Sequence, residues 1–179
     1  MTDAELPLPL RFELPHAAWR PVSPESLGVS NAAFLAVRQG TDQAYEPTLT
    51  ISGGWRDDPA TLRDIADETV ARLRVDATDV EILDRQEVTT EHAPAVTQLI
   101  RAAAVIDGRP FDLRQGQVVA GYVDVEDPSI RVVVLYTLTC TAAQLPTVGR
   151  EFQAFMASVE VVPPGPAPGA EPRPEPVPS

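Results

Sequence analysis

Residues 94–141 limit the fold more than any other part of the sequence, because they predict three consecutive β-strands. Asp107 and Gly108 separate the first two strand-like runs. An Asp-Gly pair here favours a hairpin, since both central residues of a type I′ turn need a positive φ. The last run, 131–140, is apolar on both faces, which is typical of a central strand covered on both sides. We expect its side chains to divide between two layers, with Val132, Val134, Tyr136 and Leu138 facing one and Val133 and Leu135 facing the other.

Two amphipathic helices are predicted on either side of this meander. The first is expected at residues 58–75, with Asp58 as its N-cap. The second is expected at residues 142–160, after a capping box formed by Thr141 and Gln144. Each helix has one stripe of inward-facing side chains at spacings of three and four, namely Leu62, Ile65, Ala66, Thr69 and Leu73 in the first and Leu145, Val148, Phe152, Phe155, Met156 and Val159 in the second.

Shorter strands complete the predicted sheet. They are expected at residues 11–14, pairing with 19–22, and then at 32–37, 48–52 and 80–89. The Gly53-Gly54 pair is expected to end the strand at 48–52. The predicted fold class is therefore α+β, with an antiparallel sheet of about six or seven strands sandwiched between the two helices.

The domain organisation follows from composition. The sequence predicts a flexible arm at residues 1–10 and a single α/β domain at residues 11–162. In residues 163–179, eight positions are Pro, so we expect a disordered polyproline II tail. Such a tail serves either as a spacer or as a docking peptide for a partner.

The charge of the chain excludes several partners. Its net charge of −12 argues against nucleic acid and anionic membrane surfaces, and it favours a basic protein partner. All 14 basic residues are Arg, so no lysine Schiff base or P-loop lysine is available. The N-terminal residues lack a basic and an apolar region typical of a secretory signal, and no apolar run reaches membrane-spanning length, so we expect a cytoplasmic protein.

No catalytic, cofactor or metal site is predicted. The chain has two histidines, His16 and His92, and a single cysteine, Cys140, without the spacing of a zinc site. The enzyme alternative is a hydrolase that uses Ser52 or an acidic pair, although no G-x-S-x-G motif is present. The acidic groups are Asp57/Asp58, Asp76/Asp79 and Asp124/Glu126/Asp127, and each lies where a turn favours Asp.

The two tryptophans are the predicted partner-binding residues. Trp19 and Trp55 each stand near a turn at the edge of a strand-like segment. An amphipathic indole in that position serves either for half-buried packing or for contact with a partner.

The order of elements resembles the Mog1/PsbP-like fold, with Phe12-Glu13-Leu14-Pro15 and Trp19 as its opening. Within that fold the chain looks most like the actinobacterial LpqN/LpqT lipoprotein group, with the DcrB-like proteins as wider relatives. The resemblance covers residues 10–162. It departs from the group in having 15–19 as Pro-His-Ala-Ala-Trp, without the usual Gly, and in lacking a lipobox Cys.

The resemblance implies an antiparallel sheet between helices and non-catalytic roles, which in this fold include Ran binding, photosystem assembly and the chaperoning of secretion effectors. It transfers no catalytic residue. The leading hypothesis is therefore a soluble, non-enzymatic binding, adaptor or chaperone-like domain with a protein partner that is basic or secretion-related. The alternatives are a carrier of a small apolar ligand, in a pocket between sheet and helix, and the hydrolase.

Overall fold

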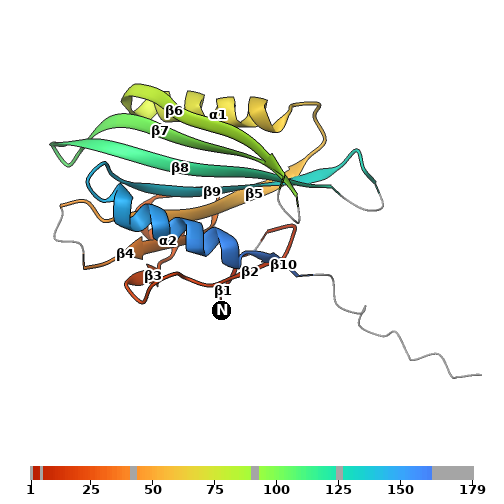
Figure 1. The fold of residues 1–179 in the computed structure, drawn as a ribbon, viewed down its shortest axis with the longest axis horizontal. Coiled ribbons are helices and arrows are strands. Elements are labelled where there is room, and N and C mark those ends of the chain that lie inside the picture. Colours follow the sequence, from red (N-terminus) through yellow and green to blue (C-terminus); the bar gives the residue numbers. More distant parts are fainter. Residues whose placement is uncertain (1, 5, 41–43, 90–92, 124–126, 163–179) are drawn as a thin grey trace, which may run out of the picture.

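The predicted meander forms three adjacent strands of a seven-stranded antiparallel sheet, whose strand order is β3-β4-β5-β9-β8-β7-β6. The computed structural model describes residues 2–4, 6–40, 44–89, 93–123 and 127–162 (Figure 1). The meander consists of β7 (Pro94–Ile106), β8 (Arg109–Val123) and β9 (Arg131–Thr141). Its first turn has φ values of 51° at Asp107 and 78° at Gly108, which confirms the predicted hairpin.

The other strands of this sheet are β3 (Trp19–Pro21), β4 (Ala32–Arg38), β5 (Thr48–Arg56) and β6 (Thr78–Thr89). One sequence expectation about them is wrong. Gly53 and Gly54 do not end β5, which continues to Arg56. A Cβ at Gly53 would lie 2.3 Å from the carbonyl oxygen of Val133, so this glycine permits close backbone approach inside the strand.

A second, three-stranded sheet has the order β1-β2-β10. It consists of β1 (Thr2–Ala4), β2 (Leu10–Phe12) and β10 (Glu160–Val161). Strand β2 therefore pairs with β10, near the C-terminus. The expected pairing of residues 11–14 with 19–22 is wrong, because β3 pairs with β4. Part of the expected flexible arm at residues 1–10 belongs to this sheet, because β1 pairs with β2 and Leu10 is only 1% exposed.

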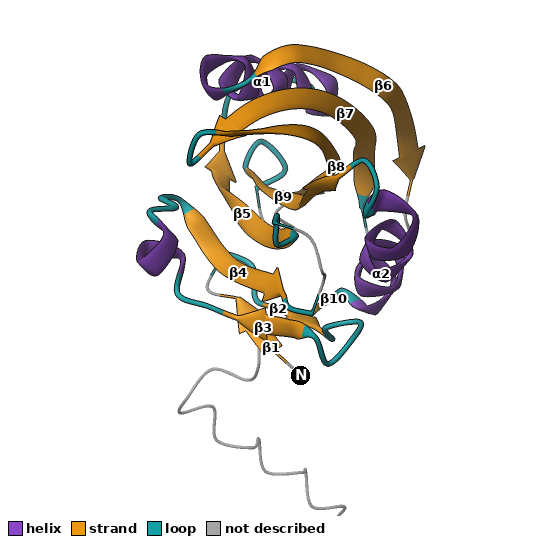
Figure 2. Ribbon diagram, turned by 90° about the vertical axis from the view of Figure 1, so that its left-hand side faces the viewer, coloured by secondary structure: helices purple, strands orange, loops and turns teal. Residues whose placement is uncertain are grey.

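The large sheet is strongly curved, with helix α1 (Leu62–Asp76) on its convex face and helix α2 (Leu145–Ser158) on its concave face (Figure 2). This arrangement confirms the α+β sandwich. The side chains of β9 divide as predicted: Val132, Val134, Tyr136 and Leu138 belong to the core cluster beneath α2, and Val133 and Leu135 belong to the cluster beneath α1. A short 3-10 helix, η1 (Pro24–Leu27), connects β3 and β4.

Helix α1 (Leu62–Asp76) begins four residues later than the sequence suggested. Its N-cap is Thr61, and the expectation of Asp58 as the N-cap is wrong. Thr61 and Asp64 form a reciprocal capping box, in which the Thr61 N–H donates to the Asp64 carboxylate at 2.8 Å and the Asp64 N–H donates to Thr61 Oγ1 at 3.1 Å. This pair satisfies two N–H groups at the helix start, whereas Asp58 pairs with Arg56.

A buried polar cluster joins α1 to the sheet. Thr69, Gln98 and Gln117 are each less than 7% exposed. Gln98 Nε2 donates to Gln117 Oε1 at 2.6 Å and contacts Thr69 Oγ1 at 3.1 Å. The hydroxyl of Thr69 lies 2.7 Å from both Gln117 Oε1 and the carbonyl oxygen of Ala66. The buried amides therefore satisfy one another.

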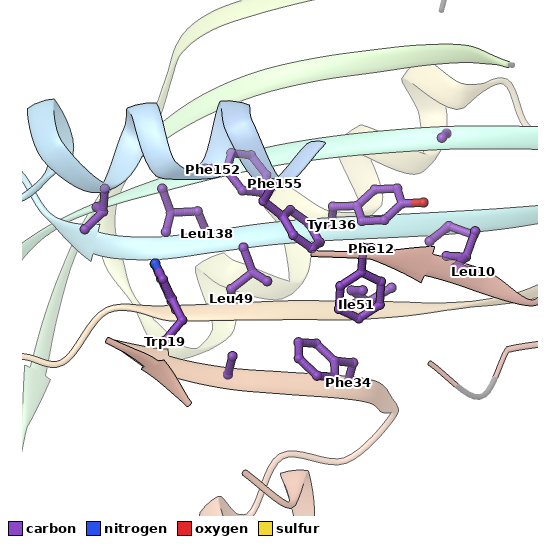
Figure 3. Packing of buried hydrophobic residues seen from close by; sticks show 14 of the residues in the cluster. Leu10, Phe12, Trp19, Phe34, Leu49, Ile51, Tyr136, Leu138, Phe152 and Phe155 are labelled. Carbon is purple, nitrogen blue, oxygen red and sulfur yellow. The ribbon is translucent and has the colours of Figure 1, made fainter. Parts of the chain in front are cut away.

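Helix α2 (Leu145–Ser158) packs on the concave face. The predicted exchange between Thr141 and Gln144 is present, since the Thr141 N–H donates to Gln144 Oε1 at 2.9 Å and the Gln144 N–H donates to Thr141 Oγ1 at 3.3 Å. Residues 142–144 nevertheless form a turn, so the helix starts at Leu145. Phe155 points into the aromatic core and meets Phe12 at a ring-centroid distance of 5.3 Å (Figure 3).

Glu151 fastens α2 to the edge of the sheet. Its carboxylate accepts from Arg38 Nε at 2.8 Å, from Arg38 Nη2 at 2.9 Å and from Trp19 Nε1 at 2.7 Å. The Arg38 and Glu151 side chains are 13% and 14% exposed. The Arg38 guanidinium holds the pKa of the Glu151 carboxyl below its usual value. Glu151 therefore links α2 to β4 through a bidentate ion pair with Arg38, and to β3 through the hydrogen bond from Trp19.

We expect Glu151→Ala to lower the free energy of unfolding by about 2–3 kcal/mol at pH 7, because it leaves a mostly buried guanidinium and an indole N–H without an acceptor. Urea unfolding followed by circular dichroism measures the change. The matched control is Glu87→Ala, since Glu87 is 66% exposed and lies 4.0 Å from Arg63. A loss equal to that of the control would show that the Glu151 pair contributes nothing.

The same pair predicts how stability depends on pH. A carboxyl whose pKa is lower in the folded state stabilises the fold fully above its unfolded pKa, about 4.3, and loses that contribution as the pH falls through the folded value. The difference in unfolding free energy between wild type and Glu151→Ala should therefore shrink below about pH 4. A difference that stays constant down to pH 2 would contradict the assignment.

Candidate functional site

An open groove lies between α2 and the concave face of β6, β7 and β8. It encloses about 590 Å³. Its floor comes from strand positions that pair across the sheet and therefore point to one face, Thr97 with Val118 and Leu99 with Gly116. The groove is lined by Asp84, Thr97, Gln98, Leu99, Gly116, Gln117, Val118, Leu138, Leu145, Pro146, Gly149, Arg150, Phe152, Gln153 and Met156.

Two glycines widen this groove, one in its floor and one in its helical wall. A Cβ at Gly116 would lie 3.7 Å from the ring of Phe152. A Cβ at Gly149 would lie 3.5 Å from Cδ1 of Leu145. Both are ordinary contact distances, so the surrounding packing does not require glycine at either place. The absent side chains leave room beside Phe152 and Leu145.

Two charged residues of opposite sign line the groove, Asp84 on β6 and Arg150 on α2. The Asp84 carboxylate accepts a long hydrogen bond from Gln86 Nε2 at 3.3 Å. Within the described residues, Arg150 has no ion pair. An apolar floor with one charge on each wall is suited to binding an amphipathic segment.

The two tryptophans occupy different environments. Trp19 is 3% exposed and its indole N–H is bonded to Glu151, so the expectation that it contacts a partner is corrected. Trp55 is 54% exposed and stands beside a second depression that Arg56, Asp57 and Ile130 also line. Trp55 therefore stays a predicted partner contact.

Ser52 does not belong to an assembled nucleophilic site in the part of the chain that is described. It lines a depression beside α1 together with Asn31, Thr69 and Arg72, and no histidine or carboxylate of the described residues bonds to it. His16 Nδ1 accepts the N–H of Ala18 at 3.0 Å within its own turn. His92 lies outside the described residues.

Two of the acidic residues predicted from the sequence, Asp58 and Asp127, take part in an ion pair and in a turn. Asp58 pairs with Arg56 and lies 3.5 Å from Arg131. Asp127 Oδ1 accepts the N–H of Ser129 at 3.0 Å, and its neighbours Asp124 and Glu126 lie outside the described residues.

Metal and thiol chemistry gain no support from the described ranges. They contain no group of three or more His, Cys, Asp and Glu residues that could hold a metal ion. Cys140 is fully buried, and burial raises the pKa of its thiol to about 12, which is the opposite of what a nucleophilic cysteine needs. The expectations of no cofactor and no catalytic residue stay predictions.

The groove was missed by the sequence reasoning. A weak signal existed, because Gly149 interrupts an otherwise regular helical stripe and Gly116 lies inside a strand. Interior glycines weaken both kinds of element and often mark close approach or a binding surface. The sequence could not show that the two would face one groove.

Comparisons with known proteins find the same fold in several solved structures. No protein-family model matches the chain, and no curated protein matches its sequence. Among solved structures, it is similar to LpqN, involved in cell envelope biogenesis of Mycobacterium tuberculosis, with a TM-score of 0.60, 12% identity and coverage of 90% of each chain. It is also similar to cyanobacterial PsbP from Synechocystis sp. PCC 6803, with a TM-score of 0.52, 12% identity and coverage of 82% of this chain and 83% of that one.

The chain has a Mog1/PsbP-like fold. A third similar structure is PA94 from Pseudomonas aeruginosa, a protein of unknown function, with a TM-score of 0.53, 17% identity and coverage of 84% of this chain and all of the other. At these identities the likeness shows the fold alone. In the described part of this chain, neither helix is long and apolar enough to cross a membrane.

We expect Gly149→Ala to raise the free energy of unfolding by about 0.5–1 kcal/mol, because alanine restricts the unfolded chain more and favours the helix interior. The added methyl meets Leu145 at ordinary contact distance, so no strain offsets the gain. Guanidinium unfolding of both proteins measures it. A destabilised variant would show that the helical wall is closed at this point and not open.

Proposed function

We propose that this chain is a non-catalytic binding domain that holds an apolar segment of a protein partner in the groove along α2. The open apolar groove is the observation that carries this proposal. Its floor and helical wall offer Leu99, Val118, Leu138, Phe152 and Met156 to an occupant. Each apolar side chain that such a surface buries contributes about 1.5–3 kcal/mol, which is enough to hold a segment with three or four anchors.

A protein segment suits the groove better than an enclosed small molecule. The groove is open to solvent, whereas sites for small ligands usually bury most of the ligand surface. The net charge of −12 favours a basic partner, because attraction between unlike charges speeds encounter. A secretion-related partner and a cytoplasmic location stay predictions from the resemblance and the sequence.

The carrier of a small apolar ligand is the second candidate. It is favoured by the volume of about 590 Å³, which lies within the usual range for small-molecule sites. Native mass spectrometry of the purified protein separates the two. A small molecule that stays bound to wild type and is absent from a groove-filled variant would favour the carrier.

The test of the proposed function fills the groove without touching the core. Wild type, Gly149→Leu and Ala154→Leu are used as baits in native lysate, and captured proteins are quantified by mass spectrometry. Ala154 is exposed on α2 and does not line the groove, so it receives the same side chain on the same helix. We expect wild type and Ala154→Leu to capture the same partner.

Gly149→Leu should bind that partner at least about tenfold more weakly, the equivalent of about 1.4 kcal/mol of lost contact. Equal capture by all three baits would overturn the assignment of the groove as the binding site. Trp55→Ala is included as a further bait. A loss confined to Trp55→Ala would move the contact to the surface around Trp55.

A further inference from the structure

The C-terminal end of the described chain lies close to one end of the groove. Helix α2 forms the groove wall from Leu145 to Met156. The chain then passes through β10 to Val162, whose N–H donates to the carbonyl oxygen of Pro9 at 3.0 Å. Met156, Val159 and Val161 all pack against the same core cluster. Val162, the last described residue, therefore follows within six positions of Met156, the last residue of α2 that lines the groove.

Residues 163–179 are long enough to run the whole length of the groove. In a polyproline II conformation 17 residues span about 53 Å, at about 3.1 Å each. The helical wall from Leu145 to Met156 is about 18 Å long, at about 1.5 Å per residue. The segment has to reverse direction after Val162 to enter the groove, and Gly165 permits the backbone conformations that such a turn needs.

The chemistry of residues 163–179 matches the groove. Eight prolines have no N–H to leave unpaired against an apolar floor, and a preformed polyproline II segment loses little entropy on docking. Glu171, Arg173 and Glu175 alternate in charge. They supply a cation for Asp84 and an anion for Arg150, the two charged residues that line the groove.

We propose that residues 163–179 dock in the α2 groove of their own chain and compete there with the partner. This inference rests on the proposed function only in taking the groove as the binding site. A tethered segment experiences an effective concentration of about 1 mM. A peptide with a dissociation constant of about 0.1–1 mM when free would then occupy the groove for half of the time or more. Removal of the segment should raise partner affinity about two- to tenfold.

The two methionines allow a direct test. Met156 lines the groove and Met1 is the only other methionine, so a protein labelled with ¹³C at the methionine methyl groups gives two signals. We compare the full chain with a chain that ends at Val162. The Met156 methyl signal should move on truncation and the Met1 signal should not. Adding a synthetic peptide of residues 163–179 to the truncated chain should move the Met156 signal back toward its position in the full chain.

Charge variants test the register of docking. In the full chain, Arg150→Glu should shift the Met156 signal toward the truncated position, and Arg150→Lys should leave it near that of wild type. Arg74→Glu is the control, because Arg74 is exposed in the last turn of α1. An identical Met156 signal in the full and truncated chains would overturn the proposal. So would a shift that depends on protein concentration, since it would place the segment in the groove of a second copy.

The outcome separates the two proposals. If truncation leaves the Met156 signal unchanged while Gly149→Leu still loses the partner, the groove binds a partner without intrachain competition. If the peptide restores the signal but Gly149→Leu captures the partner as well as wild type, the segment occupies a groove that the partner does not use.

Discussion

The double-sided burial of β9 is the constraint on which the rest of this structure depends. Its alternating side chains enter two separate cores, one beneath each helix. The buried side chains of α1, such as Ile65 and Ala66, share a cluster with Val133, and those of α2, such as Phe152 and Phe155, share one with Val134 and Tyr136. Because β9 also pairs with both β5 and β8, it joins the β3-β4-β5 side of the sheet to the strands that line the groove beside α2.

Local signals predicted a large part of the fold. It included the Asp107-Gly108 turn, the hydrogen bonds exchanged between Thr141 and Gln144, and the alternation of side chains along β9. Each of these depends on residues that lie close together in the sequence. Short sequence motifs are enough to predict such interactions. The overall class followed because strand and helix periodicities differ clearly along this chain.

The failures were of two kinds. The sequence predicted Asp58 as the N-cap of α1, whereas Thr61 takes that position because the Asp64 carboxylate accepts the Thr61 N–H in return. The pairing of β2 with β10 joins residues about 150 positions apart, and no local pattern specifies it. The groove was not predicted for the same reason. Gly116 and Gly149 line one groove only because the fold places a strand and a helix side by side.

The placement of the two tryptophans has a practical consequence for spectroscopy. Trp19 is enclosed and its indole N–H bonds to a carboxylate, whereas more than half of Trp55 is in contact with water. Their emission spectra should therefore differ, the first shifted toward the blue and the second toward the red. Collisional quenchers will reach Trp55 first. The protein thus contains one fluorescent reporter near α2, Trp19, and another at the C-terminal end of β5, Trp55. Partial opening of either region can be followed without an added label.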